Sequence, residues 1–387
     1  MKNFIFSNPT KIIFGRDTVD QIGRETRSYG KSALLVYGQK SIFDSGLYGR
    51  ITASLQGAGL TVFEHGGVCS NPLLGHVREG IKKAKEAGVE VIVAVGGGSV
   101  IDSAKAIAAG VLVDHDVWQF FKGKKPIRQT MPLTCVLTLA ASGSEMNGGM
   151  VVTNEETKQK FGTANYLLHP KTSILDPTLT FSVSKAYTAY GAIDAMAHIL
   201  EFYLTAEDLE TPVQDRLMEG LLQNIMTACD KVMISPNDYL ARADLMWCAT
   251  LALNGLTGAG LGRVSLPMHM IEHSLSALFN VPHGAGLSVV IPGWMRYNAA
   301  KDPRKTAQLA ARVFNLQNKD TVRLASLGIE ALKGWFQQIG GPATLRQLNI
   351  SESEIDALAE NAIALAKIWR VREYGKDEIA AVLQLCC

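Results

Sequence analysis

The chain has 387 residues, of which 47% are hydrophobic and 36 are glycine, and this length is sufficient for two domains with full apolar cores. Its 38 basic and 36 acidic side chains nearly cancel and form no run of like charge, so a nucleic-acid partner is not expected. The sequence has neither a signal-peptide pattern at its start nor the roughly 20 consecutive apolar residues of a membrane-spanning helix. The six cysteines show no CxxC spacing, as is typical of free thiols in a reducing compartment. We therefore expect a soluble cytoplasmic protein, not bound to membrane, that acts on a small molecule.

Up to about residue 180, short apolar runs alternate with helical patterns. Residues 1–15 alternate apolar and polar side chains like a strand, and further strands are expected at 33–37, 60–63, 91–95, 134–139 and 172–175. Strands that alternate with helices predict a mostly parallel sheet covered on both faces.

From residue 184 onward the sequence contains long amphipathic segments, such as 185–204, 215–233 and 239–256, separated by Pro and Gly. This half is predicted to be all helical. The periodicity changes just beyond Asp176-Pro177, and a residue before proline is disfavoured in a helix. We expect an α/β dinucleotide-binding domain at 1–180 and an all-α metal-binding domain at 181–387.

A Gly-Gly-Gly-Ser turn at 96–99 connects the expected strand 91–95 to a helical pattern at 100–113. Glycines let a backbone approach phosphate closely, and the N-terminus of the helix offers free N–H groups to an anion. The sequence therefore predicts a pyrophosphate site. The alternative is that Ser99 and Asp102 form only a capping box and that the glycines form only a tight exit from the strand.

The end of the first internal strand, Gly38-Gln39-Lys40-Ser41, carries no carboxylate where a dinucleotide fold usually holds the ribose 2′-hydroxyl. Lys40 could offer positive charge and Ser41 a hydrogen bond to a 2′-phosphate. We therefore predict a preference for NADP(H) over NAD(H). A second polar turn at 138–145 follows another apolar strand and could also approach the cofactor.

Histidines cluster in the second half. Asp194 and His198 lie four residues apart in a helical pattern, His269 and His273 repeat that spacing, and His283 follows on a turn. Residues spaced by four project from one face of a helix. Each histidine alone more often has a capping or core role, but the combination, with a carboxylate on an apolar helix, favours a divalent metal. Imidazoles with one carboxylate suit Fe²⁺ or Zn²⁺. Glu201, three residues past His198, either orients a metal ligand without binding the metal or is an ordinary surface residue.

Together these stretches resemble the iron-containing (group III) alcohol dehydrogenases, in the branch of NADPH-dependent butanol dehydrogenases and broad-range aldehyde reductases. The resemblance covers nearly the whole chain and rests on residues 96–105, 138–145, Asp194 with His198, His269 with His273, and Pro282-His283-Gly284. It implies a dehydroquinate synthase-like architecture. It also implies that Asp194, His198, His269 and His283 are the metal ligands, and that His273 lies beside the metal as a catalytic proton relay.

By the same resemblance, the cofactor contacts would be Gly38, Ser41, Gly97, Gly98, Ser99, Asp102, Thr138, Leu139, Ser142, Lys160 and Leu179. One departure is that many relatives have Thr-Thr where this chain has Thr138-Leu139, so one hydroxyl is missing and contact at 139 would be through the backbone.

The expected activity is hydride transfer between NADP(H) and small aliphatic primary alcohols or aldehydes, with the metal as a Lewis acid. One alternative is glycerol-dehydrogenase-type polyol oxidation with NAD, although that type generally has fewer histidines at these positions. A second alternative is a metal-dependent hydrolase, which would use the glycine turn or the histidines but not both. A homodimer is expected, because the strand-like residues 4–14 could pair with a second subunit.

Overall fold

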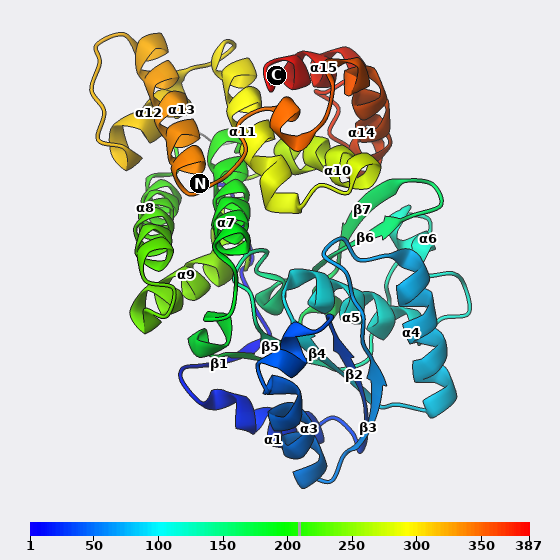
Figure 1. The fold of residues 1–387 in the computed structure, drawn as a ribbon. Helices are drawn as coiled ribbons and strands as arrows, with labels where there is room; N and C mark the ends of the chain where they lie inside the picture. Colours follow the sequence, from blue (N-terminus) through cyan, green and yellow to red (C-terminus); the bar gives the residue numbers. More distant parts are fainter. Residues whose placement is uncertain (208–209) are drawn as a thin grey trace. The chain divides into compact units, whose positions relative to one another are not determined.

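The computed structural model describes residues 1–207 and 210–387 (Figure 1). It divides into two compact units, one formed by Ser7–Val183 and the other by Met1–Phe6 with Ser184–Cys387. The predicted division at residue 180 differs from this at the N-terminus, because the first six residues pack with the helical unit. There the backbone N–H of Lys2 donates a 2.8 Å hydrogen bond to the carbonyl of Gly260.

Six parallel strands form the sheet of the α/β unit, in the order β1-β8-β5-β4-β2-β3. Their bounds are Lys11–Phe14 for β1, Ser32–Tyr37 for β2, Thr61–His65 for β3, Val91–Gly96 for β4, Leu133–Leu137 for β5 and Thr172–Leu175 for β8. The strand order reverses between β2 and β4. In open parallel sheets, ligands bind at the carboxyl ends of the strands beside such a reversal.

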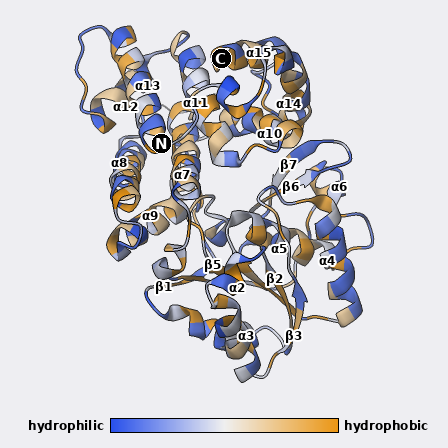
Figure 2. Cartoon of the chain, viewed as in Figure 1, coloured by the Kyte–Doolittle hydropathy of each residue, from blue (hydrophilic) through white to orange (hydrophobic). Residues whose placement is uncertain are grey.

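Helices cover both faces of this sheet. Leu35 and Val93 pack with Ile51 in one apolar cluster, while their neighbours Leu34 and Ile92 are equally buried and point to the opposite face. The helices of this unit are α1 Ile22–Arg27, α2 Ser41–Asp44, α3 Leu47–Gly57, α4 Leu74–Ala87, α5 Gly98–Gly110 and α6 Trp118–Phe121. The strands β4 and β5 are coloured as hydrophobic in Figure 2, whereas α4 carries both kinds of residue. The predicted mostly parallel, two-sided sheet is confirmed.

Two features differ from the sequence-based expectation. Only Lys11–Phe14 of the expected N-terminal strand 1–15 is a strand, and it lies at the edge of the sheet beside β8. An antiparallel hairpin, β6 Gly149–Asn154 with β7 Gln159–Ala164, was not expected. Its strands contain glycine, Lys160 and Gln159, which weaken the apolar alternation that marks a strand.

The second unit is helical, and no residue that the structure describes beyond Ser184 lies in a strand. Its helices are α7 Lys185–Thr205, α8 Pro212–Ile234, α9 Tyr239–Ala252, α10 Pro267–Phe279, α11 His283–Ala299, α12 Arg304–Val313, α13 Thr321–Gln338, α14 Ile355–Trp369 and α15 Lys376–Gln384. Helix α7 packs against α8, α9, α10 and α11, and its side chains from Gly191 to Leu204 are all buried. Among the described helices, none combines the length and the hydropathy needed to cross a membrane.

A buried ionic network ties α7, α8 and α12 together. The ammonium of Lys305 lies 2.7 Å from both carboxylate oxygens of Asp215 and stands over the ring of Tyr203 at 4.5 Å. The amide of Gln308 donates to Asp215 at 2.8 Å, and the hydroxyl of Tyr203 donates to Glu219 at 2.7 Å. Lys305 and Asp215 are both buried, and the ammonium of Lys305 is the nearer of two cations to this carboxylate, since Arg312 lies 3.8 Å away.

Replacing Lys305 with Met should lower the free energy of unfolding by about 3–5 kcal/mol, because the buried carboxylate of Asp215 loses its nearest compensating charge. Urea denaturation followed by circular dichroism measures this loss, with the exposed Lys319→Met as the control. A loss no larger than that of the control would show that Asp215 does not need the ammonium.

Candidate metal centre and cofactor site

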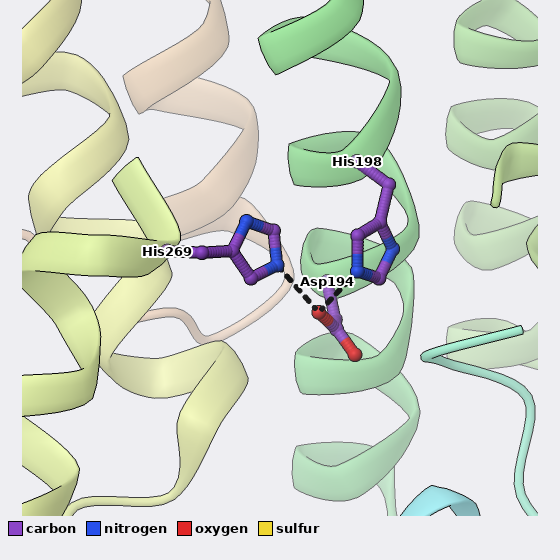
Figure 3. Close-up of side chains that lie close together, drawn as sticks. All are labelled: Asp194, His198 and His269. Atoms are coloured by element: carbon purple, nitrogen blue, oxygen red, sulfur yellow. Dashed lines mark ion pairs between the residues drawn. The ribbon is translucent and has the colours of Figure 1, made fainter. Parts of the chain in front are cut away.

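Three imidazoles of the helical unit converge on one carboxylate oxygen, which belongs to Asp194. Asp194 and His198 project from α7, His269 projects from α10, and His283 begins α11. The Nε2 atoms of His198, His269 and His283 lie 3.7, 3.5 and 3.5 Å from Oδ1 of Asp194. Figure 3 shows the imidazoles of His198 and His269 turned toward this carboxylate. The structure thus brings together all four predicted metal ligands.

The spacing of these nitrogen and oxygen atoms is better suited to a shared metal ion than to hydrogen bonds between the side chains. Distances of 3.5–3.7 Å are too long for hydrogen bonds, and neither Oδ1 of Asp194 nor Nε2 of His269 has a hydrogen-bond partner although both are buried. Buried polar atoms without partners cost free energy, which a shared ligand would restore. Three imidazole nitrogens and a carboxylate are the donors expected for Fe²⁺ or Zn²⁺.

The electrostatics of the cluster also favour a cation. Burial acts to raise the pKa of Asp194, but the imidazoles of His198, His283 and His269 outweigh it and hold the pKa below the ordinary value. Burial lowers the pKa of His198 to about 3, although Asp194 opposes this, so the ring is neutral and free to ligate. Burial also acts to lower the pKa of His269, but Glu201 and Asp194 raise it to about 10. A metal would therefore displace a proton from His269.

Two buried glutamates orient two of the four predicted metal ligands. Glu201 of α7 accepts from Nδ1 of His269, and it also accepts from the backbone N–H groups of Met268 and His269 at 2.5 and 3.1 Å. It therefore caps the N-terminus of α10 and turns Nε2 of His269 toward Asp194. Glu272 of α10 does the same for His283, accepting from its Nδ1 and from the hydroxyl of Ser276. Glu201 is thus not an ordinary surface residue, since it is fully buried.

His273 lies beside this cluster. It is one turn beyond His269 on α10, and its side chain is only 3% exposed. Its ring centroid lies 5.6 Å from that of His283. The indole of Trp369, at the end of α14, meets the imidazole edge to face at 5.5 Å. Ligand atoms of His273, Glu272 and His283 also lie within 4.8 Å of one another, so His273 borders the cluster around Asp194.

In the α/β unit, the glycine turn joins β4 to α5 as expected. Gly97 adopts an extended conformation immediately before α5, and Gly98 is the first residue of that helix. Ser99 does not cap the helix, because the N-cap residue is Gly97 and no side chain accepts a capping hydrogen bond there. The hydroxyl of Ser99 instead donates to the carbonyl of Ser70 at 2.5 Å. The capping-box alternative is therefore wrong for Ser99. The free N–H groups at the start of α5 remain suited to an anion.

The second polar turn packs against the glycine turn. The N–H of Thr138 donates to the carbonyl of Gly96 at 3.0 Å. A Cβ on Gly97 would lie 3.2 Å from Cβ of Leu139, and a Cβ on Gly98 would collide with the hydroxyl of Ser142. Glycine at these two positions lets the loop after β5 approach, so residues distant in sequence lie side by side at the start of α5.

The remaining predicted cofactor residues are distributed more widely. Gly38 lies close to α5, since a Cβ there would be 3.8 Å from Val100. Ser41 begins α2 directly beyond it, and Lys160 of β7 donates to Asn71 at 3.2 Å. Leu179 packs against the apolar cluster on the α1 and α3 side of the sheet. Both carboxylate oxygens of Asp102 accept hydrogen bonds from the protein, one from the hydroxyl of Ser144 at 2.6 Å and the other from the N–H of Val151 at 2.9 Å.

Several residues of the two sites were not singled out from the sequence. Asn71 and Ser70 follow β3, and their place at the carboxyl end of a parallel strand was a usable signal. Glu272 was adjacent to a predicted site residue, but its partner His283 lies on the next helix. Trp369 is 96 positions from His273 in the chain, so no local pattern connects them.

Two protein-family models match this chain. The model described as iron-containing alcohol dehydrogenase matches residues 9–177, and the model described as the C-terminal part of the Fe-containing alcohol dehydrogenase family matches residues 188–386. The two matches cover the α/β unit and the helical unit almost completely.

Full-length relatives agree with these matches. The chain is 40% identical to a probable NADH-dependent butanol dehydrogenase 1 of Bacillus subtilis, over 99% of each chain. It is 34% identical to the NADPH-dependent aldehyde reductase YqhD of Escherichia coli, over 92% of each. The crystal structure of NADH-dependent butanol dehydrogenase A from Thermotoga maritima is similar with a TM-score of 0.96 and 40% identity, covering 100% of this chain and 99% of that one. The resemblance inferred from the motifs is confirmed, and the chain belongs to the iron-containing alcohol dehydrogenase family.

Proposed function

We propose that this enzyme interconverts small aliphatic primary alcohols and aldehydes by hydride transfer with NADP(H), and that it holds one Fe²⁺ or Zn²⁺ on Asp194, His198, His269 and His283. The observation that carries the proposal is the convergence of three imidazole Nε2 atoms, at 3.5–3.7 Å, on one buried carboxylate oxygen. The names of the relatives support the substrate class, since they are butanol dehydrogenases and an aldehyde reductase.

The residues divide the chemical work between them. When bound, the divalent cation supplies Lewis-acid chemistry to the reacting carbon–oxygen group. Glu201 and Glu272 keep Nε2 of His269 and His283 directed at the site. His273 passes a proton between solvent and the substrate oxygen through its imidazole. The free N–H groups at the start of α5 bind the cofactor pyrophosphate.

The rate of NADPH absorbance decay with butyraldehyde tests this function. We expect activity to be lost after chelation and restored by adding back either Fe²⁺ or Zn²⁺, and the cation that restores it identifies the metal. Activity that survives complete metal removal would contradict the proposal.

The alternative of polyol oxidation with NAD is distinguished in the same assay by its substrate. Glycerol with NAD⁺ should give little turnover, because the similar proteins that support the substrate class are named as butanol dehydrogenases and an aldehyde reductase. A higher kcat/KM for glycerol than for butanol would favour the alternative.

Replacing Glu201 with Gln should weaken metal affinity about 10–100-fold, because the charged acceptor that orients His269 is lost. Metal content after dialysis against a graded chelator series measures the change. Glu207→Gln is the control, since Glu207 belongs to the same unit but pairs with Lys2 at its surface. Equal metal retention in both variants would remove Glu201 from this role.

Replacing His273 with Gln should lower kcat about 100-fold or more, because the general acid–base group is lost while the metal ligands stay. Steady-state kinetics across pH and metal analysis measure the two effects separately, with His115→Gln in the other unit as the control. Full turnover at every pH would exclude His273 as the proton relay.

The proposed preference for NADP(H) rests on the end of β2. Gln39, Lys40 and Ser41 are exposed there, and none of them is a carboxylate that would repel a 2′-phosphate. The relatives' names point both ways, to NADH in Bacillus subtilis and to NADPH in Escherichia coli. The proposed preference for NADP(H) therefore rests on the positive charge of Lys40 and the lack of a carboxylate in this segment.

Replacing Lys40 with Ala should raise KM for NADPH about tenfold and leave KM for NADH unchanged, because a charge-assisted hydrogen bond to the 2′-phosphate is lost. Lys31→Ala, an exposed lysine at the other end of β2, is the matched control. A parent enzyme with higher kcat/KM for NADH than for NADPH would overturn this preference.

A cytoplasmic location and a homodimer complete the proposal. The exposed apolar side chains of Phe4, Ile5 and Phe6 support a second copy as the partner, since they would otherwise remain in water.

A further inference from the structure

One lysine of the α/β unit is completely buried. Lys105 lies on α5, two turns beyond the glycine turn, and none of its side chain is exposed. Burying an ammonium group costs free energy unless its donors are satisfied. The cofactor contacts inferred from the family pattern do not include this residue, so its burial needs another explanation.

All the hydrogen-bond acceptors of this ammonium belong to one segment after β5. Its Nζ donates to the hydroxyl of Ser144 at 2.9 Å, to the carbonyl and side-chain oxygens of Asn147 at 2.9 and 3.2 Å, and to the carbonyl of Gly149 at 2.7 Å. The segment cannot move away without leaving a buried charge unsatisfied. Burial lowers the pKa of Lys105 to about 8, opposed by Asp102, Cys135 and Glu145, so the ammonium form prevails at neutral pH.

A second tie runs from the same helix. Asp102, one turn before Lys105, accepts from the hydroxyl of Ser144 at 2.6 Å and from the N–H of Val151 at 2.9 Å. Ser144 therefore joins the carboxylate and the ammonium, and α5 holds the segment 144–151 by groups of opposite charge. Charge-assisted hydrogen bonds of this kind are stronger than neutral ones.

The held segment continues directly from the loop that packs on the glycine turn. The hydroxyl of Ser142 accepts from the N–H of Ser144 at 3.3 Å, and it lies against Gly98. Leu139 lies against Gly97 in the same way. A shift of Ser144 would therefore alter the backbone surface at the start of α5.

We propose that Lys105 is a positioning residue for the cofactor, which holds the loop 138–149 against the Gly97-Gly98 turn without touching the cofactor itself. This inference rests on the proposed function, because it assumes that the turn binds the nicotinamide dinucleotide. Its consequence is that cofactor affinity, rather than metal binding, depends on Lys105.

The test compares two buried lysines that carry the same substitution. Lys105→Met and Lys305→Met each remove a buried ammonium, but Lys305 belongs to the helical unit. The dissociation constant for NADPH is measured by fluorescence titration without substrate, together with the melting temperature and the metal content. We expect both variants to melt earlier, but only Lys105→Met to bind NADPH about tenfold more weakly, with its metal content unchanged.

Ser144→Ala provides a milder variant, because it leaves the acceptors from Asn147 and Gly149 in place. We expect it to weaken NADPH binding about threefold, because it removes contacts of the segment with both Asp102 and Lys105. If Lys105→Met does not fold, this variant decides whether the hold of α5 on the segment affects NADPH binding. A dissociation constant equal to that of the parent in the folded variants would overturn the role of Lys105 alone. A parent protein that binds neither NADPH nor NADH would instead overturn the proposed function, and the inference with it.

Discussion

The arrangement of helices in the helical unit depends on the surroundings of one buried carboxylate, that of Asp194. Oδ1 of Asp194 has three imidazole nitrogens around it and no hydrogen-bond donor, and α7, α10 and the start of α11 are all required to produce that arrangement. A carboxylate in such surroundings needs compensating positive charge. Burial acts to lower the pKa of His269, but Glu201 and Asp194 outweigh it and raise the pKa to about 10. A divalent cation held by these four side chains would supply the compensating charge.

The carboxylates of Glu201 and Glu272 hold His269 and His283, two of the proposed metal ligands, in position. Glu201 belongs to α7 but caps α10, and Glu272 belongs to α10 but holds His283 of α11. Glu201 therefore connects α7 to α10, and Glu272 connects α10 to α11. Gly286 permits this contact, because a Cβ there would lie 2.6 Å from Oε1 of Glu272. The same interactions that assemble the helices also fix which imidazole nitrogen faces the metal.

Local patterns in the sequence predicted much of this protein. The spacing of Asp194 and His198 on a strongly helical segment was enough to place both on one face of α7. The glycine turn after β4 was predicted for the same reason, because a strand, a glycine turn and a helix follow one another in the chain. The resemblance to a known family added the metal ligand set and the role of His273, which spacing alone left open.

Contacts between distant segments were not predictable in this way. The β6–β7 hairpin has too few apolar residues to show a strand pattern, and the extended N-terminus reads as a strand although most of it pairs with nothing in the sheet. The ammonium of Lys105 finds its acceptors about 40 positions away, which only the packed sheet brings near. Capping also differed, because the hydroxyl of Ser99 donates to the carbonyl of Ser70 and accepts from no capping N–H of its own helix.

Anomalous X-ray diffraction at the iron and zinc absorption edges, on crystals grown with each metal, tests the central claim most directly. The account predicts one strong peak within about 2.0–2.2 Å of Oδ1 of Asp194 and of the Nε2 atoms of His198, His269 and His283. The same data from a His269→Ala variant should lack that peak. A peak elsewhere in the molecule, or none in an active enzyme, would contradict the account.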